Sequence, residues 1–204
     1  MFGKRKYIKR LETELINAKD ELRSYRRESE KIYNNVVRIK NSKISSNVTI
    51  DSSVIQDSSI DEGTSIGPFS HIHKNSIIGK ENRIGNYTEI KNSILGNKTK
   101  AAHLSYIGDC IIGSEVNIGC GSIIVNYDGM NKTTSVIKDK VFIGSNSNII
   151  SPIIIEENSF IAAGSTVTQN IKANSFVIAR SKETIKENRA QDFPYYQNKN
   201  KRSE

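Results

Sequence analysis

The chain has 204 residues, of which 36% are hydrophobic and none is tryptophan, and its formal net charge is +8. This length predicts one domain with enough apolar residues to bury a core. No run of about 18 apolar residues occurs, so we expect no membrane span, and the polar start argues against a secretory signal. The two cysteines, Cys110 and Cys120, form no metal or redox spacing. We therefore expect a reduced, cytoplasmic protein.

The positive charge is unevenly distributed along the chain. Residues 1–43 carry a net charge of +7, residues 44–180 carry −1, and residues 181–204 carry +2. A basic protein would ordinarily indicate a nucleic-acid or acidic-membrane partner. Because the long central part is neutral, we expect no nucleic-acid partner.

Residues 1–36 are predicted to form a basic N-terminal helix with a coiled-coil seam. No Gly or Pro occurs between Lys4 and Asn34, and apolar residues recur in steps of three and four. The seam consists of Ile8, Leu11, Leu15, Ala18, Leu22, Tyr25, Ser29, Ile32 and Val36. We expect this helix to associate with other copies of the chain. Two alternatives are an amphipathic helix on its own body and a helix on a membrane surface.

A six-residue repeat occupies the body, predicted as residues 37–180. Aliphatic residues recur every six positions with one-residue slips, and tight-turn residues surround them. The series consists of Val48, Val54, Ile60, Ile66, Ile72, Ile78, Ile84, Ile90, Leu95, Ala101, Ile107, Ile112, Ile118, Ile124, Ile137, Ile143, Ile149, Ile155, Ile161 and Val167. Three strand-and-turn units close one triangular coil, and coils stack into a solenoid. The predicted fold is an all-β body, a left-handed parallel β-helix.

Two segments fall outside this rhythm. Ile137 follows Ile124 by thirteen positions, where the repeat has a step of six, so we expect a loop expelled from one edge of the solenoid. Residues 181–204 are polar and are predicted to form a C-terminal tail.

Five segments carry a resemblance to a known family. They are 89–96 (EIKNSILG), 100–109 (KAAHLSYIGD), 116–121 (VNIGCG), 126–132 (NYDGMNK) and 161–167 (IAAGSTV). These segments resemble the acetyltransferase half of the bacterial bifunctional N-acetylglucosamine-1-phosphate uridyltransferase/glucosamine-1-phosphate acetyltransferase, a hexapeptide-repeat acyltransferase. The resemblance implies acetyl transfer from acetyl-CoA to the amine of glucosamine-1-phosphate, for cell-wall precursor synthesis. It also implies a homotrimer with sites between neighbouring β-helices.

The nucleotidyltransferase half has no counterpart in the 36 residues before the repeats, so we expect no uridyltransferase activity. A separate uridyltransferase would then be a partner.

Acetyl transfer needs a base for the amine proton and donors for the oxyanion, and we expect no metal for it. By the resemblance, His103 is the general base, and imidazole suits proton transfer near neutral pH. We expect Glu89 to orient His103 through a hydrogen bond.

The resemblance also implies two sets of binding residues. The sugar-phosphate set consists of His73, Lys91, Tyr106, Asn117 and Lys132, with Lys132 reaching across the trimer interface. The acetyl-CoA set consists of Cys120, Asn126, Tyr127, Ser145, Ala163 and Arg180. Lysine suits a phosphate as a mobile point charge, and small residues let a pantetheine arm lie close to the coils.

One departure leaves the acceptor open. His71 and His73 stand where the family has arginines, and histidine lacks the full charge and the bidentate fork of arginine. Lys91 and Lys132 would then hold the phosphate, or the acceptor is a nucleotide-linked or surface-polysaccharide amino sugar. A further alternative is a non-catalytic trimeric scaffold.

Overall fold

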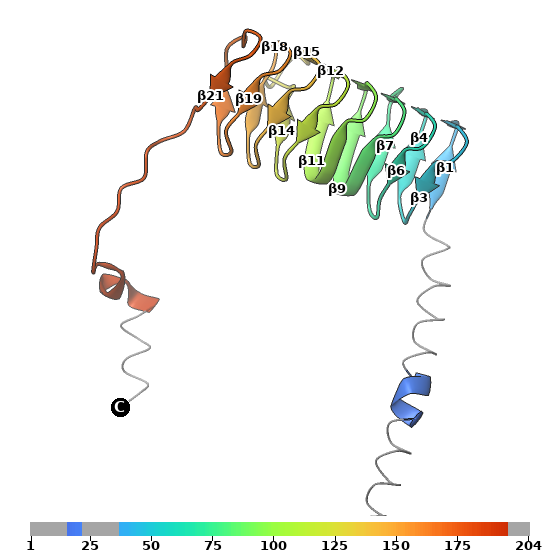
Figure 1. Ribbon diagram of the computed structural model, residues 1–204, viewed down its shortest axis with the longest axis horizontal. Helices are drawn as coiled ribbons and strands as arrows, with labels where there is room; N and C mark the ends of the chain where they lie inside the picture. Colours follow the sequence, from blue (N-terminus) through green and yellow to red (C-terminus); the bar gives the residue numbers. More distant parts are fainter. Residues whose placement is uncertain (1–15, 22–36, 196–204) are drawn as a thin grey trace, which may run out of the picture.

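The computed structural model describes residues 16–21 and 37–195. From Arg38 to Val177 the chain winds through about eight coils of short parallel strands. Figure 1 shows these coils stacked along the long axis of the body, with β1 at one end and β21 at the other. The predicted all-β, left-handed parallel β-helix is therefore confirmed.

Each coil contributes one strand to each of three faces. The first face contains β1 (Arg38–Lys40), β4 (Val54–Gln56), β7 (His71–His73), β14 (Ile123–Val125), β17 (Asn148–Ile150) and β20 (Thr166–Val167). The second contains β3 (Thr49–Ile50), β6 (Ser65–Ile66), β13 (Asn117–Ile118), β16 (Phe142–Ile143), β19 (Phe160–Ile161) and β21 (Phe176–Val177). The third contains β2 (Lys43–Ile44), β5 (Ser59–Ile60), β8 (Ile77–Ile78), β10 (Ile94–Leu95), β12 (Cys110–Ile112), β15 (Ser135–Ile137) and β18 (Ile154–Ile155).

Two longer strands join the second face to the first. They are β9 (Arg83–Lys91) and β11 (Lys100–Gly108), which pair in parallel over most of their length. Their N-terminal ends continue the second face, and their C-terminal ends continue the first face. The chain at this corner therefore keeps strand pairing while it changes direction.

The repeated aliphatic side chains form the core. Every member of the predicted series from Ile60 to Val167 is buried, and successive members stack on one another down the inside of the coil. The prediction is wrong at Val54, because the side chain that points inward there is Ile55. The steps there are five residues rather than six, since Ile55 is the register partner of Ile72, so counting six positions back from Ile60 gives Val54. The prediction is also wrong at Val48, which packs against the core while staying partly exposed, because Ile50, the register partner of Ile66, holds the inward position.

Small polar residues form a second buried ladder at the corners. Thr64 Oγ1 donates to the Gly79 carbonyl at 2.9 Å, Ser70 Oγ to Gly85 at 2.7 Å, and Thr99 Oγ1 to Gly113 at 2.9 Å. Each hydroxyl thereby gives a carbonyl of the next coil a hydrogen-bond partner. Side-chain hydrogen bonds thus link adjacent coils in addition to the backbone ladder.

The predicted N-terminal helix is described only at residues 16–21, which are helical and exposed. The remainder of residues 1–36, with most of the predicted seam, lies outside the described residues, so a long helix is not supported. Beyond β21 the described chain continues to residue 195 and includes one short 3-10 helix, η1 (Ala190–Asp192). No helix in these described segments is long and apolar enough to cross a membrane.

Candidate active site

One corner of the solenoid brings together several of the predicted site residues. Where the second face turns into the first, one residue per coil has a left-handed backbone, including Phe69 (φ 61°), Tyr87 (φ 57°) and Leu104 (φ 32°). Side chains with a Cβ rarely adopt this conformation, and such strain gathers at functional sites. The residue just before each of these turns occupies the same place in successive coils.

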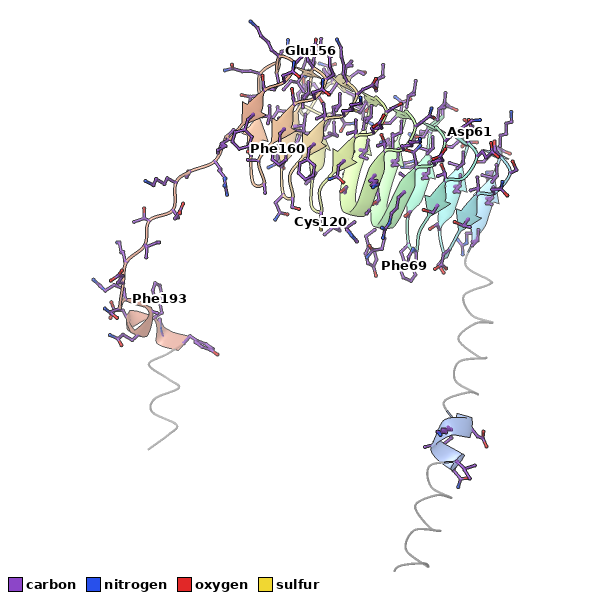
Figure 2. All side chains as sticks on the ribbon, in the orientation of Figure 1. Asp61, Phe69, Cys120, Glu156, Phe160 and Phe193 are labelled. Atoms are coloured by element: carbon purple, nitrogen blue, oxygen red, sulfur yellow. The ribbon has the colours of Figure 1, made fainter. Side chains whose placement is uncertain are left out.

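We call these preceding residues the corner column: Asn86, His103, Cys120, Ser145 and Ala163. Backbone hydrogen bonds link their coils, from Gly121 N to the Leu104 carbonyl at 2.7 Å, from Asn146 N to Cys120 at 2.8 Å, and from Gly164 N to Ser145 at 2.8 Å. In Figure 2, Cys120 and Phe69 lie along the same long edge of the body, opposite Asp61 and Glu156. The predicted base and three predicted acetyl-CoA residues therefore form one continuous line.

The imidazole of His103 is positioned by Asn86 in the corner column. His103 Nδ1 lies 3.0 Å from Asn86 Oδ1, and the two residues are register partners in β11 and β9. An amide oxygen can only accept, so Nδ1 carries the proton and Nε2 keeps its lone pair. The side chain of His103 is exposed. This tautomer is the one that a general base acting through Nε2 requires.

Asn86 was not among the residues singled out from the sequence. It stands at the same repeat position as His103, one coil earlier, so aligning the repeats by their turns would have found it. The predicted hydrogen bond from Glu89 to His103 is wrong in this chain. Glu89 Oε1 instead accepts from His73 Nε2 at 3.0 Å, because His73 lies on β7 beside the first-face end of β9.

An open hollow of about 440 Å³ lies next to His103 at this corner. Its lining consists of Tyr87, Glu89, Leu104, Ser105, Tyr106, Gly121, Ile123 and Asn146. The exposed side chains of Tyr87 and Leu104 give it apolar walls, while Glu89 and Tyr106 supply polar groups. The hollow can accept an elongated, partly apolar ligand beside Leu104, the residue that follows His103.

Arg180 lies beside the far end of the corner column. A Cβ placed on Gly164, the neighbour of Ala163, would lie 3.7 Å from Arg180 Cδ. Gly164 has φ 73°, which glycine adopts without strain. A guanidinium at the end of a line of small residues can pair with a ligand phosphate.

Positive charge gathers at the other edge of the first face. The side-chain nitrogens of Lys91, in β9, and Lys132, in the inserted loop, lie beside each other. The neighbouring Lys91 lowers the pKa of Lys132, and the charge of Lys74 adds to this effect. The neutral amine of Lys132 accepts a hydrogen bond from the ammonium of Lys91 and so raises the pKa of Lys91, with Tyr106 and then Asp109 acting in the same direction. A bound dianion would relieve the repulsion between these lysines.

The inserted loop, residues 126–134, is held at its base by Asp109. The carboxylate of Asp109 is buried and accepts hydrogen bonds from the side-chain amides of Asn92 and Asn126. Within the loop, Asp128 Oδ1 accepts from the backbone N–H groups of Asn131 at 2.6 Å and Met130 at 2.8 Å. Those two bonds lower the pKa of Asp128. The loop is thereby shaped so that it carries Lys132 to Lys91.

Tyr106 packs against the same loop base. A Cβ on Gly108 would lie 2.5 Å from Tyr106 Oη and 2.6 Å from Asn126 Nδ2. Only glycine leaves room there for the phenol, so Gly108 directs Tyr106 toward the lysines. Tyr127, the neighbour of Asn126, is exposed and pairs across the loop with Lys132.

The predicted residues do not all meet within one chain. Asn117 lies in β13 on the second face, where it pairs with Lys100 and Phe142, away from Lys91 on the first face. Asn126 and Tyr127 lie where the first face ends, whereas Cys120, Ser145 and Ala163 lie where it begins. The acetyl-CoA residues therefore form two groups on opposite edges of the first face.

The two cysteines have contrasting surroundings. Cys110 is buried in the core, and desolvation raises the pKa of its thiol to about 12. Cys120 is exposed in the corner column. Neither forms a disulfide, and Cys110 is inert as a nucleophile because only a thiolate reacts readily.

Two protein-family models and several curated proteins match parts of this chain. The family described as the GMPPB C-terminal domain matches residues 54–141, and the bacterial transferase hexapeptide (six repeats) matches residues 134–169. The chain is 51% identical over 117 residues, 57% of its length, to a protein of Bacillus mycoides named Bifunctional protein GlmU, covering 26% of that protein. It is 50% identical over 150 residues, 74% of its length, to the protein of that name from Clostridium acetobutylicum, covering 33% of it.

The chain therefore spans only about a quarter to a third of the curated relatives it matches. Among solved structures, it is similar to a mutant perosamine N-acetyltransferase from Caulobacter crescentus in complex with CoA and GDP-perosamine. That similarity has a TM-score of 0.50 at 15% identity and covers 57% of this chain and 53% of the other, which supports a common fold. The chain carries the hexapeptide repeat of bacterial transferases and is homologous, over more than half of its length, to part of the proteins named GlmU.

Proposed function

We propose that the protein is an acetyl-CoA-dependent N-acetyltransferase that acts on an amino-sugar phosphate, most specifically glucosamine-1-phosphate. The observation that carries the proposal is the placement of His103. Its Nε2 lone pair is kept free by Asn86, and it lies next to a hollow and in line with Cys120, Ser145 and Ala163. A base in line with the small residues of the corner column suits attack by an amine on a thioester that lies along this column.

The similarity to bifunctional GlmU proteins supports a transferase of amino-sugar metabolism. The perosamine N-acetyltransferase of similar fold was crystallised with CoA, and CoA is the thiol that this reaction releases. We infer that the protein uses cytoplasmic acetyl-CoA as co-substrate.

In the proposed reaction the sugar amine attacks the carbonyl carbon of the thioester. A C–N bond forms, the carbonyl oxygen becomes an oxyanion, and His103 Nε2 takes a proton from the nitrogen. The oxyanion then re-forms the carbonyl as the C–S bond breaks. The imidazolium returns the proton to the departing sulfur, which leaves as CoA thiol. No covalent enzyme intermediate is needed, and Cys120 serves as a small packing residue beside CoA.

The lysine cluster supplies the phosphate site in this proposal. Lys91 and Lys132 are in contact, and Lys74 adds charge nearby. His73 is engaged by Glu89, so the phosphate relies on the lysines. Because Lys132 contacts Lys91 of its own chain, this part of the phosphate site needs no neighbouring subunit.

We propose a homotrimer in which the two groups of acetyl-CoA residues come from neighbouring chains. Asn117 on the second face would also join the site from a neighbour. The third face supports association, because Ile77, Ile94, Ile111 and Ile154 lie exposed in one row along it. Large exposed apolar patches of this kind mark protein interfaces.

A second acceptor class has one observation in its favour. The His73–Glu89 contact occupies the first face beside Lys91, where a further positive group would strengthen the hold on a free sugar phosphate. A nucleotide-linked amino sugar would spread its negative charge over a larger area, so its binding would depend less on a further positive group beside Lys91. It is therefore the runner-up.

A thiol-release assay across an acceptor panel tests the proposal. The purified full chain is incubated with acetyl-CoA and glucosamine-1-phosphate, glucosamine or a nucleotide-linked amino sugar. We expect the highest kcat/KM with glucosamine-1-phosphate and a large loss without the phosphate. A preference for the nucleotide sugar would favour the second class. No turnover of any acceptor, with no binding of acetyl-CoA, would indicate a non-catalytic scaffold.

A further inference from the structure

The first face carries a cluster of metal-ligating side chains that acetyl transfer does not use. One ligand atom from each of His71, His73 and Glu89 lies within 4.8 Å of the other two. His71 and His73 flank the inward-pointing Ile72 on β7, so both imidazoles project from the outer side of one strand. Glu89 is the register partner of His71 on β9.

One atom of this cluster lacks a partner. His71 Nε2 is buried and, among the described residues, makes no hydrogen bond. Its ring stacks on that of His73, with centroids 4.1 Å apart and planes inclined by 7°. A buried nitrogen without a partner is costly, and native structures normally satisfy such atoms. The arrangement therefore has an unused ligand atom on a ring that is stacked beside a second imidazole and a carboxylate.

We propose that His71, His73 and Glu89 bind one divalent transition-metal ion of the zinc class. Imidazole nitrogen and carboxylate oxygen are ligands that zinc accepts, and three protein ligands leave a fourth position for water or an anion. Magnesium prefers an all-oxygen set and soft copper(I) prefers sulfur ligands, so both are less suited to this set. The expectation that the reaction needs no metal is unaffected, because His103 takes the proton and is not a member of the cluster, although Glu89 also lines the hollow at the corner.

Metal binding requires a defined rearrangement. Tetrahedral zinc with ligand distances of about 2.0–2.2 Å places the ligand atoms about 3.3 Å apart. Two parallel stacked rings cannot both direct a lone pair at one ion, so one imidazole must rotate out of the stack. Between His73 and Glu89, which are 3.0 Å apart, the ion replaces the shared proton. Binding therefore releases a proton.

One consequence depends on the proposed function. His73 and Lys91 are register partners, so a bound dication would add positive charge beside the lysine cluster. The KM for the sugar phosphate should then fall when zinc is bound. Failure of this effect alone would count against the coupling or the proposed function, whereas the metal site is tested separately below.

The direct test is a zinc titration of the metal-free full chain by calorimetry. Cys120→Ser serves as the background, since it removes the exposed thiol as a competing ligand. We expect one site per chain, and His71→Gln or Glu89→Gln should weaken affinity by about tenfold or more. His103→Gln is the matched control, because it removes the remaining histidine of the chain from outside the cluster and should leave affinity unchanged.

Two further readouts keep the result unambiguous. Cobalt should give the intense visible absorption of a four-coordinate site in the background protein and lose it in His71→Gln. Thermal melts without metal must show that His71→Gln is folded, and zinc should raise the melting temperature of the background only. Equal zinc affinity in His71→Gln and the background, or equal losses in His71→Gln and His103→Gln, would overturn the proposal.

Discussion

The contact between Asn86 and His103 determines which imidazole nitrogen can act as a base. Nδ1 donates to Asn86 Oδ1 at 3.0 Å, so Nε2 is left as the acceptor. The segment around His103 identified that residue, whereas Asn86 can be found only by aligning the repeats by their turns. The partner appears only when the coils are placed in register, because 17 residues separate the two side chains. Glu89, which we expected from the sequence to orient His103, contacts His73 instead.

Replacing Asn86 should therefore change catalysis without changing substrate binding. Asn86→Leu removes the acceptor, and we expect kcat to fall about tenfold, the value of one hydrogen bond of about 1.4 kcal/mol. Asn86→Asp keeps an acceptor and adds a negative charge that favours the imidazolium, so the acidic limb of the pH–rate profile should move to higher pH. Unchanged kcat and an unchanged profile in both variants would remove Asn86 from this positioning role.

The two cysteines give a second test at the residue scale. An alkylating reagent at pH 8 should modify exposed Cys120 and spare Cys110, whose pKa is raised to about 12 by burial. Saturating acetyl-CoA should slow the modification of Cys120 several-fold, measured by mass spectrometry of the peptides. Equal rates with and without acetyl-CoA would place its binding site away from the corner column.

At the scale of the elements, the six-residue period predicted the coils and almost all of the core. From Ile60 to Val167 the predicted side chains point inward, and every strand in this range except β9 and β11 is two or three residues long. The period failed at Val54, where the adjacent Ile55 points inward. It did not predict the continuous strands β9 and β11, which cross a corner held by Tyr87 and Leu104, where later coils have Gly121, Asn146 and Gly164.

A core substitution tests the inward ladder. Ile107 is fully buried, so Ile107→Ala should lower the free energy of unfolding by about 2–5 kcal/mol through lost burial and a residual cavity. The matched control is Ile178→Ala, because the side chain of Ile178 is 56% exposed and loses little contact. Denaturant midpoints measured by circular dichroism compare the two. Equal midpoints for the two variants would contradict the conclusion that the side chain of Ile107 points into the core.

At the scale of the whole molecule, most of the net positive charge lies in a part of the sequence other than the proposed site, and the predicted site residues do not all come together within a single chain. Most of the net positive charge lies in residues 1–43, and Lys91 and Lys132, which we propose bind the phosphate, belong to the neutral body. The two groups of predicted acetyl-CoA residues lie on opposite edges of the first face, and Asn117 lies on the second face. The resemblance predicted which residues form the site, but the sequence could not show that they are distributed over different faces of the solenoid.

This distribution predicts complementation between defective copies. Asn117→Ala and Lys91→Ala should each lower activity strongly when expressed alone. In mixed trimers some sites would combine an intact Asn117 from one chain with an intact Lys91 from another. Co-expressed, differently tagged variants should therefore recover part of the activity after purification through both tags. Activity no higher than that of either variant alone would indicate that each site is built within one chain.

The central claim is that His103 takes the amine proton during acetyl transfer, and the kcat of His103→Ala in the thiol-release assay tests it most directly. The account predicts a loss of about a hundredfold or more in kcat, with acetyl-CoA binding retained in a separate titration. A variant that binds acetyl-CoA and turns over at nearly the parental rate would contradict it.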